Sequence, residues 1–242
     1  MFREATMALG LFFVTFSAIA SAQPAPPTPG EATFTIFLRS NSSGIERSRL
    51  ERTETGWLIH GNGRITAPID LETSRFEIEY DSNWEPLRLE VDGSRDGTSF
   101  NLNSIFRSSG IVNELQEGTD IFTSNDPIEP TSVVLPNFFF SAYEALAVRL
   151  GATAPGSQLS VYVAPHGHIT ATINTVSTRQ LETASGTLHA RVYGLTFDDP
   201  QQPLRTEVWV DQNQRLMRVS MPTAFIEAVS YTHLTLPTIL LV

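Results

Sequence analysis

Cysteine is absent from this chain of 242 residues. Its absence excludes disulfide bonds, thiolate metal sites, a cysteine nucleophile and a lipid anchor on an N-terminal cysteine. Lysine is absent too, so all 16 basic residues are arginine, and with 26 acidic residues the formal net charge is −10. Because an acidic surface repels phosphate groups, we expect neither nucleic acids nor anionic membranes as partners.

Long apolar runs are scarce, and the most extended one lies near the N-terminus, from Met7 to Ala20. It follows Arg3 and leads into Ala20-Ser21-Ala22, a pattern typical of a cleaved secretory signal peptide. A membrane anchor is the alternative, but the run is shorter than the ~20 residues of a membrane span. We therefore predict a signal peptide over residues 1–22, a Pro-rich linker over 23–32, and export to the periplasm or beyond without a transmembrane span.

Apolar and polar residues alternate from Thr33 onward, as in strands with one buried face and one face in water. Segments 76–80 and 87–91 show this alternation and are separated by the turn sequence DSNWEP. Similar hairpins recur, so we predict one β-rich domain over residues 33–228. The expected fold is mainly β, with roughly ten antiparallel strands in a curved sheet or open half-barrel and one packed helix.

The segment VVLPNFFFSAYEALAVRLG has helical periodicity instead. Four residues form its expected buried stripe: Phe139, Tyr143, Leu146 and Leu150. Glu144 and Arg149 lie on the opposite face, Asn137 or Ser141 is the expected N-cap, and Gly151 suits the C′ position. The stripe is expected to face four apolar residues of the sheet: Phe76, Ile78, Leu87 and Leu89.

Two segments in different halves of the chain resemble each other. FEIEYDSNWEPLRLEV and TEVWVDQNQRLMRVSM both have the order strand, turn with an aspartate, strand. A common origin of the two halves is one interpretation, and the general likeness of hairpins is the other.

The aromatic start of the predicted helix is the candidate ligand-binding site, with five residues: Phe138, Phe139, Phe140, Tyr143 and Leu146. Such a cluster could line the mouth of an apolar cavity under a curled sheet, which predicts a hydrophobic small molecule as ligand. The alternative is that the same residues form the core between helix and sheet, the usual role of an amphipathic stripe.

His166 and His168 form the most metal-like pair, because positions i and i+2 of a strand share a face, and His189 could add a third ligand. Pro165 and Gly167 place the pair at the edge of a loop, so solvated histidines are the favoured interpretation. We predict no metal and no cofactor.

Catalytic patterns are lacking. The chain has no G-x-S-x-G nucleophile elbow, so no catalytic residue is assigned. Asp211-Gln212-Asn213 begins like a calcium loop, but Leu216 and Pro222 occupy the positions that need glycine and glutamate, which indicates a turn.

The C-terminal segment VSYTHLTLPTILLV, residues 229–242, carries no charge. Its first ten residues resemble one reading frame of the transposon-end adapter used in sequencing libraries, GTC-TCT-TAT-ACA-CAT-CTG-ACG-CTG-CCG-ACG. We therefore predict that residues 229–242 are adapter-derived, that they add no essential strand, and that the natural gene continues differently.

Residues 33–227 resemble the region that precedes the catalytic domain in bacterial secreted α/β-fold hydrolases of the serine aminopeptidase type. The likeness lies in the run from Phe34 to Gly93, in VLPNFFFSAYEALAVRL, in EVWVD and in RLMRVSM. It implies a hydrolase domain as a C-terminal partner in the full-length protein. The hairpin layout is also distantly similar to periplasmic lipoprotein carriers, in which a curved sheet and helices enclose an acyl chain.

Two functions follow from these patterns. The first is a non-catalytic exported β domain, the N-terminal accessory module of a truncated secreted hydrolase. The second is a periplasmic carrier that stands alone and binds a lipid or another hydrophobic ligand.

Overall fold

A computed structural model describes residues 26–129, 131–183, 186–199 and 202–230. This part contains one α-helix, α1 (Tyr143–Leu150), and two short 3₁₀ helices, η1 (Phe140–Ala142) and η2 (Pro222–Ala224). Its strands are β1 (Gly30–Leu38), β2 (Asn41–Arg52), β3 (Gly56–Ile65), β4 (Leu71–Asp81), β5 (Pro86–Arg95), β6 (Thr98–Arg107), β7 (Gly110–Glu117), β8 (Asp120–Asp126), β9 (Val133–Val134), β10 (Gln158–Val163), β11 (Gly167–Thr183), β12 (Gly186–Phe197), β13 (Leu204–Val210), β14 (Leu216–Met221) and β15 (Ile226–Ser230). The predicted signal peptide lies outside the described residues, and the last three residues of the predicted linker already belong to β1.

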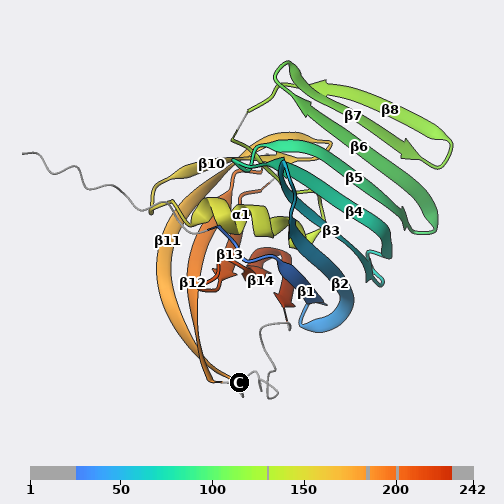
Figure 1. The fold of residues 1–242 in the computed structure, drawn as a ribbon. Helices are drawn as coiled ribbons and strands as arrows, with labels where there is room; N and C mark the ends of the chain where they lie inside the picture. The colour runs from blue at the N-terminus through green and yellow to red at the C-terminus, as the bar shows by residue number, and fades with distance from the viewer. Residues whose placement is uncertain (1–25, 130, 184–185, 200–201, 231–242) are drawn as a thin grey trace, which may run out of the picture.

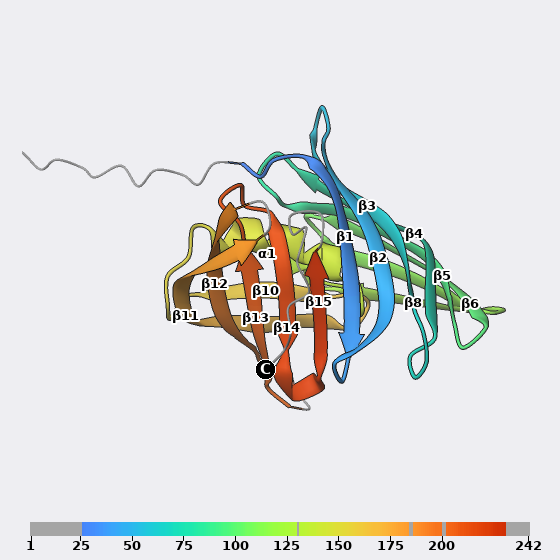
Figure 2. The ribbon, with the colours of Figure 1, turned by 90° about the horizontal axis from the view of Figure 1, so that it is seen from below.

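All of these strands form one curled sheet, in the order β8-β7-β6-β5-β4-β3-β2-β1-β15-β14-β13-β12-β11-β10-β9 (Figures 1 and 2). The chain starts in the middle with β1 and meanders to the edge strand β8. It then crosses to the opposite edge, β9, and meanders back until β15 pairs with β1. Every pairing is antiparallel except the short one between β9 and β10.

The predicted fold class is confirmed: a mainly β chain with an open curved sheet and one short α-helix in its described part. The sheet of 15 strands is larger than the expected ten. Several strands were not recognised in the sequence. β8, for example, lacks a buried face, and every one of its residues from Asp120 to Asn125 is exposed. Among the described residues, no helix is long and apolar enough to cross a membrane.

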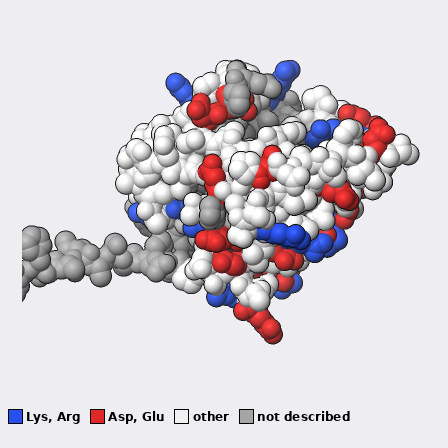
Figure 3. Space-filling model, turned by 90° about the horizontal axis from the view of Figure 1, so that it is seen from above, with Lys and Arg blue, Asp and Glu red and all other residues white. Residues whose placement is uncertain are grey.

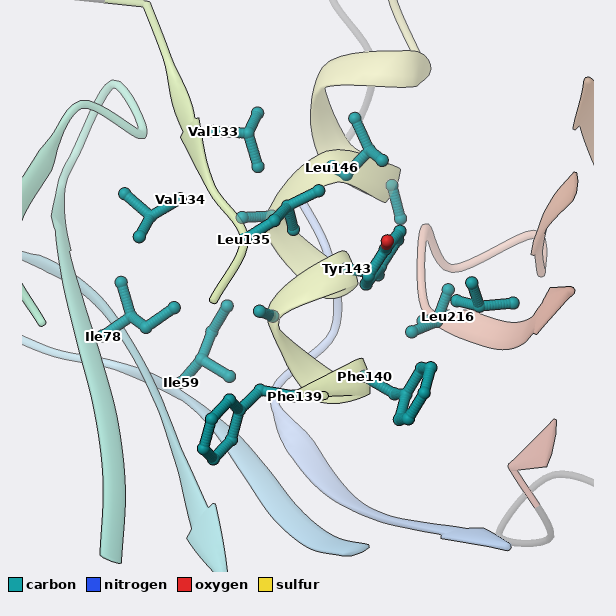
Figure 4. Close-up of a cluster of buried hydrophobic side chains, with 14 of the residues drawn as sticks. Ile59, Ile78, Val133, Val134, Leu135, Phe139, Phe140, Tyr143, Leu146 and Leu216 are labelled. Atoms are coloured by element: carbon teal, nitrogen blue, oxygen red, sulfur yellow. The ribbon is translucent and has the colours of Figure 1, made fainter. Parts of the chain in front are cut away.

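Helix α1 lies inside the curl, between the strands of the two halves (Figure 1). Phe139 stacks on Phe76 of β4 with ring centroids 5.0 Å apart. Figure 4 shows Phe139 pointing toward the side of Ile59 and Ile78, whereas Phe140 points toward Leu216. The segment around the helix start therefore fills the space between both halves of the sheet.

The predicted N-cap is wrong. Neither Asn137 nor Ser141 caps the helical turns through its side chain. Instead, the Glu46 carboxylate on β2 accepts hydrogen bonds from the backbone N–H groups of Phe140 and Ser141, at 2.9 and 2.8 Å. A distant residue thus satisfies the free donors of the helix start. Gly151 ends the helix with a right-handed φ of −55°, so the left-handed C′ role predicted for it is also wrong.

The expected polar face of the helix is wrong as well, because Glu144 is buried. Its Oε1 accepts a hydrogen bond from Nε of Arg215 at 3.1 Å, and its Oε2 accepts one from the backbone N–H of Leu216 at 2.9 Å. At the other end of the helix, Arg149 donates to the backbone carbonyl of Trp84 at 2.8 Å. The helix is enclosed on several sides, so its polar residues have partners in the sheet rather than water.

Three of the four predicted sheet partners, Phe76, Ile78 and Leu89, are buried, but Leu87 is 39% exposed. The cause is a register shift between β4 and β5: Glu79 pairs with Arg88, whereas Tyr80 pairs with Pro86. Leu87 is the extra residue in this bulge, which turns its side chain outward.

The two similar hairpins have the same turn. In the β4–β5 turn, the Asp81 side chain accepts hydrogen bonds from the N–H groups of Asn83 and Glu85, both at 2.8 Å. In the β13–β14 turn, Asp211 does the same for Asn213 and Arg215, also at 2.8 Å. The turn predicted at Asp211 is thereby confirmed.

A further correspondence links these two turns to the helix. Trp84 and Gln214, which stand at equivalent places, have φ values of 64° and 59°. The β13–β14 turn holds the start of α1 through Arg215, and the β4–β5 turn holds its end through Trp84. Equivalent turns from the two halves therefore clamp opposite ends of one helix.

A polar seam joins the two edges of the sheet. Tyr162 of β10 donates its hydroxyl hydrogen to Asp126 of β8 at 2.5 Å and accepts a hydrogen bond from Asn113 of β7 at 2.7 Å. Asn113 also donates to Asp126, at 2.8 Å. Side chains rather than a backbone ladder close the curl at this place.

Val229 and Ser230, the first two residues of the predicted adapter-derived tail, belong to β15. Val229 pairs with Thr35 on one side and with Arg218 on the other. The expectation that this segment adds no strand is therefore wrong for these two residues. Residues 231–242 lie outside the described part.

Candidate functional site: two apolar cavities around Phe138

Two cavities flank the segment 136–139, which connects β9 to the helical turns. The C-terminal cavity has a volume of about 230 Å³ and is walled by β10–β14. The N-terminal cavity has a volume of about 290 Å³ and is walled by β4–β7. Residues 136–139 line both cavities, so this segment is the partition between them.

The walls of both cavities are mostly apolar. The main residues of the C-terminal cavity are Val161, Val163, Ile169, Phe197, Leu204 and Met221. The main residues of the N-terminal cavity are Leu71, Val91, Phe100, Leu102 and Leu115. Binding pockets for small molecules are typically apolar with a few polar groups, and range over ~300–1,000 Å³. Each cavity alone is small by this measure, and the two together fall within the range.

Tyr143 is one of the residues that line the C-terminal cavity. Burial raises the pKa of its hydroxyl above the ordinary value, so the group stays neutral. It forms no hydrogen bond with the part of the chain that the structure describes. Tyr143 thus combines a place in the cavity lining with a hydroxyl that has no hydrogen-bond partner among the described residues.

Phe138 has a left-handed backbone, with φ of +67°. This conformation is a genuine outlier for a bulky side chain and costs on the order of 1–3 kcal/mol. Its side chain is half-buried, while Asn137 beside it is exposed. The partition between the cavities thus contains a strained residue at the surface of the molecule.

The structure divides the predicted site residues into two groups. Phe138, Phe139, Phe140 and Tyr143 line the C-terminal cavity. Leu146 is fully buried in the core and lines neither cavity. Sequence reasoning missed the strand residues of the wall. Their signal was the alternation in QLSVYV and HITATINTV, which shows a buried face but not an empty space behind it.

The outer rim of the N-terminal cavity is polar. Arg95, Glu117 and His166 line it, and all three are exposed. The polar residues that line the C-terminal cavity include Asn137 and Asp199. His166 therefore faces a cavity, whereas His168 lies elsewhere.

His168 belongs to a cluster with two serines. Its Nδ1 lies 3.2 Å from the hydroxyl oxygen of Ser132 and 3.1 Å from that of Ser160, and its Nε2 lies 3.0 Å from the carbonyl oxygen of Pro127. The Pro127 carbonyl can only accept, so Nε2 carries the proton and Nδ1 accepts from a serine. This is the arrangement of a base with a candidate nucleophile.

The serine–histidine cluster nevertheless lies apart from both cavities. Ser132 is 1% exposed, and none of the three residues lines either cavity. The cluster instead ties the crossing segment between β8 and β9 to β10 and β11, next to the seam. Within the described ranges, no three His, Asp or Glu side chains are grouped so that they could hold a metal ion.

Charged side chains outside the cavities are mostly distributed over the surface. Figure 3 shows acidic and basic side chains intermingled on the face seen from above. On the outer face of β4 and β5, Arg75 contacts Glu77 at 2.7 Å and Glu90 at 2.5 Å. Such exposed ion pairs contribute little and mark no site.

No family model matches the chain, and no curated protein matches it by sequence. Among solved structures, a β-barrel-like protein of the domain of unknown function DUF1849 from Brucella abortus is similar. It has a TM-score of 0.55 at 9% identity, over 85% of this chain and 96% of that chain. The likeness shows the fold: this chain is β-barrel-like.

Two other solved structures are more remote. A DUF1089 family protein from Pseudomonas aeruginosa has a TM-score of 0.40 at 12% identity, over 87% of this chain and 98% of that chain. A protein with a YmcC-like fold from Bacteroides fragilis has a TM-score of 0.30 at 11% identity, over 85% of this chain and 95% of that chain. The comparisons provide no link to a hydrolase.

Proposed function

We propose that this chain is an exported, non-catalytic β domain that binds a hydrophobic ligand between its curled sheet and the segment Pro136–Tyr143. One observation carries the proposal: two apolar cavities are separated only by a partition that contains the strained Phe138. Apolar walls that stay open to water at the surface are unfavourable, which favours a role for them.

The ligand would displace the partition rather than fill one small cavity. A shift of Phe138 out of its left-handed conformation releases strain and joins the two cavities. The free hydroxyl of Tyr143 then meets the ligand on the C-terminal side. Export is supported by the N-terminal sequence pattern.

The test is a titration of the purified chain with phenylnaphthylamine, an apolar dye whose emission rises in an apolar site. We expect saturable binding that is abolished by Ile169→Trp, since the larger side chain fills the C-terminal cavity. The matched control is Ile121→Trp, on an exposed position of β8 that lines neither cavity. Equal binding by both variants would refute the proposed site, and the unfolding temperature of each variant shows whether it is folded.

A second question is whether this domain precedes a hydrolase. The resemblance of residues 33–227 to hydrolase accessory regions and the adapter-like segment after Ala228 both favour a longer natural protein. Sequencing the genomic locus beyond codon 228 tests this. A reading frame that continues for several domains' length with G-x-S-x-G supports the accessory module, and an early stop codon supports a carrier that stands alone.

A further inference from the structure

The rim of the N-terminal cavity carries a positive charge that has no partner among the residues that the structure describes. Arg95 at the end of β5 lines this cavity and is exposed. It takes part in no ion pair and no side-chain hydrogen bond with the described residues. By contrast, Arg64 and Arg75, on the outer faces of the neighbouring strands, are both held by carboxylates within 4.0 Å.

His166 adds a second donor to the same rim, from the turn between β10 and β11. Its imidazole has no hydrogen-bond partner among the described residues. Glu117 is the one acidic group that lines this cavity, and it forms no ion pair with Arg95. The rim of this one cavity therefore offers a guanidinium, an imidazole and a carboxylate, and the rest of its lining is mostly apolar.

We infer that the ligand is a single-chain anionic amphiphile, whose charged head lies at Arg95 and His166 and whose apolar chain extends past Phe138 into the cavities. This inference rests on the proposed ligand-binding function. Arginine suits both a carboxylate and a phosphate head, because its planar donors match either group. A neutral head group would leave Arg95 without an ion-pair partner, and a cationic head group would be repelled by it.

The two cavities determine how long the apolar chain of the ligand can be. A short ligand would occupy the N-terminal cavity alone, next to Leu71, Phe100 and Leu102. A longer one has to pass the partition and reach Val163 and Ile169 on the other side. The order along the ligand is thus head at Arg95, middle at Phe138, and end in the C-terminal cavity.

The experiment compares three probes of equal chain length by calorimetric titration at low salt: decanoate, decyl phosphate and decanol. We expect the two anions to bind more tightly than decanol. Arg95→Gln should weaken the binding of both anions by about two- to fivefold, the range of an exposed charge pair, and leave decanol unchanged. Glu117→Gln should strengthen the binding of the anions. The ratio between decanoate and decyl phosphate identifies the preferred head group.

The matched control is Arg107→Gln, because Arg107 is also exposed on the same half of the sheet but lines neither cavity. Equal weakening by Arg95→Gln and Arg107→Gln would reduce the effect to net charge and overturn the inference. Decanol binding as tightly as both anions would overturn it too, while the apolar site would stand. If none of the three probes binds, the proposed function itself is wrong.

Discussion

Two buried glutamates hold the helical segment in place: Glu46 of strand β2 and Glu144 of helix α1 itself. Glu46 has no cationic partner and relies on two backbone N–H donors, from Phe140 and Ser141. Glu144 faces Arg215, whose Nη2 lies 3.0 Å from the carboxylate. A buried charge that loses its partner is strongly destabilising, so each pair fixes the helix in one position.

Glu46 makes the stability of the fold depend on pH. Burial raises the pKa of its carboxyl group above 4.5, and the two N–H donors act in the opposite direction without cancelling the effect. Since the folded pKa exceeds the unfolded one, this group stabilises the fold most below pH 4.5, and its contribution falls as pH rises through the folded pKa. Burial also raises the pKa of Glu144, which adds a contribution of the same sign. Urea unfolding across this window should therefore show the decline in the native chain and a smaller decline in Glu46→Gln.

Glu77 is the control for this prediction, because the hydrogen bond from Arg75 lowers its pKa. Its contribution to the free energy of unfolding is present above the unfolded pKa and is lost as pH falls. Glu77→Gln should therefore change the slope of stability against pH in the direction opposite to Glu46→Gln. The same slope in both variants would show that Glu46 is not the source.

Removing one partner of the buried ion pair should be costly. Glu144→Ala leaves Arg215 buried without its carboxylate and the N–H of Leu216 without an acceptor. We expect a loss of about 3–5 kcal/mol in the free energy of unfolding, measured by urea denaturation. The double variant Glu144→Met with Arg215→Met removes both charges and should lose less. A double variant with a lower free energy of unfolding than Glu144→Ala would contradict this explanation.

At the scale of the element, helix α1 is a core element. Leu146 is fully buried, and truncating such a side chain costs about 2–5 kcal/mol. Leu146→Ala should therefore lower the urea midpoint strongly and leave dye affinity unchanged, because Leu146 lines neither cavity.

Leu87→Ala is the matched control for the helix, with the same chemical change at an exposed position. We expect a change within about 0.5 kcal/mol. If Leu146→Ala were as mild as Leu87→Ala and weakened dye binding instead, the helix would be a lid over the ligand rather than part of the core.

The positions of strands and helix could be predicted from the sequence better than the burial of their individual side chains. Alternation in 76–80 and helical spacing in Phe139–Leu150 located strands and helix, because both patterns are local. The burial of Glu144 could not be predicted, since its partner Arg215 comes 71 positions later and only the curl of the sheet brings them together. The exposure of Leu87 depends on a bulge, which shifts register without a distinctive residue.

At the scale of the whole molecule, the candidate site was predicted in part. A cluster of aromatics at a helix start indicated where a ligand could lie, but not that the segment 136–139 divides two cavities. Nor could the rim formed by Arg95 and His166 be predicted, because Arg95 ends β5 in one half of the sheet and His166 lies in the β10–β11 turn of the other half.

The boundary of the natural chain can be tested on the whole fold. A chain ending at Ser230 keeps all of β15, and we expect the same unfolding temperature as for the full chain if residues 231–242 are adapter-derived. A chain ending at Ala228 loses the pairing of Val229 with Thr35 and Arg218, and of Ser230 with Phe34. Each lost hydrogen bond costs roughly 0.5–1.5 kcal/mol, so calorimetry should resolve the second truncation. Destabilisation by the first one would contradict the adapter origin.

The pairing of β1 with β15 decides how the domain responds to mechanical force. The two strands are antiparallel, and Phe34 near the start of β1 pairs with Ser230 at the end of β15. Tension applied through the two ends of the chain therefore pulls this pair apart like a zipper, and one pairing breaks after another from that point. If the force acted on opposite ends of the two paired strands, the strands would instead be sheared, and all hydrogen bonds between them would share the load. A domain of this topology, tethered at both ends, should open at its middle under low force, and the polar seam opposite would bear none of the initial load.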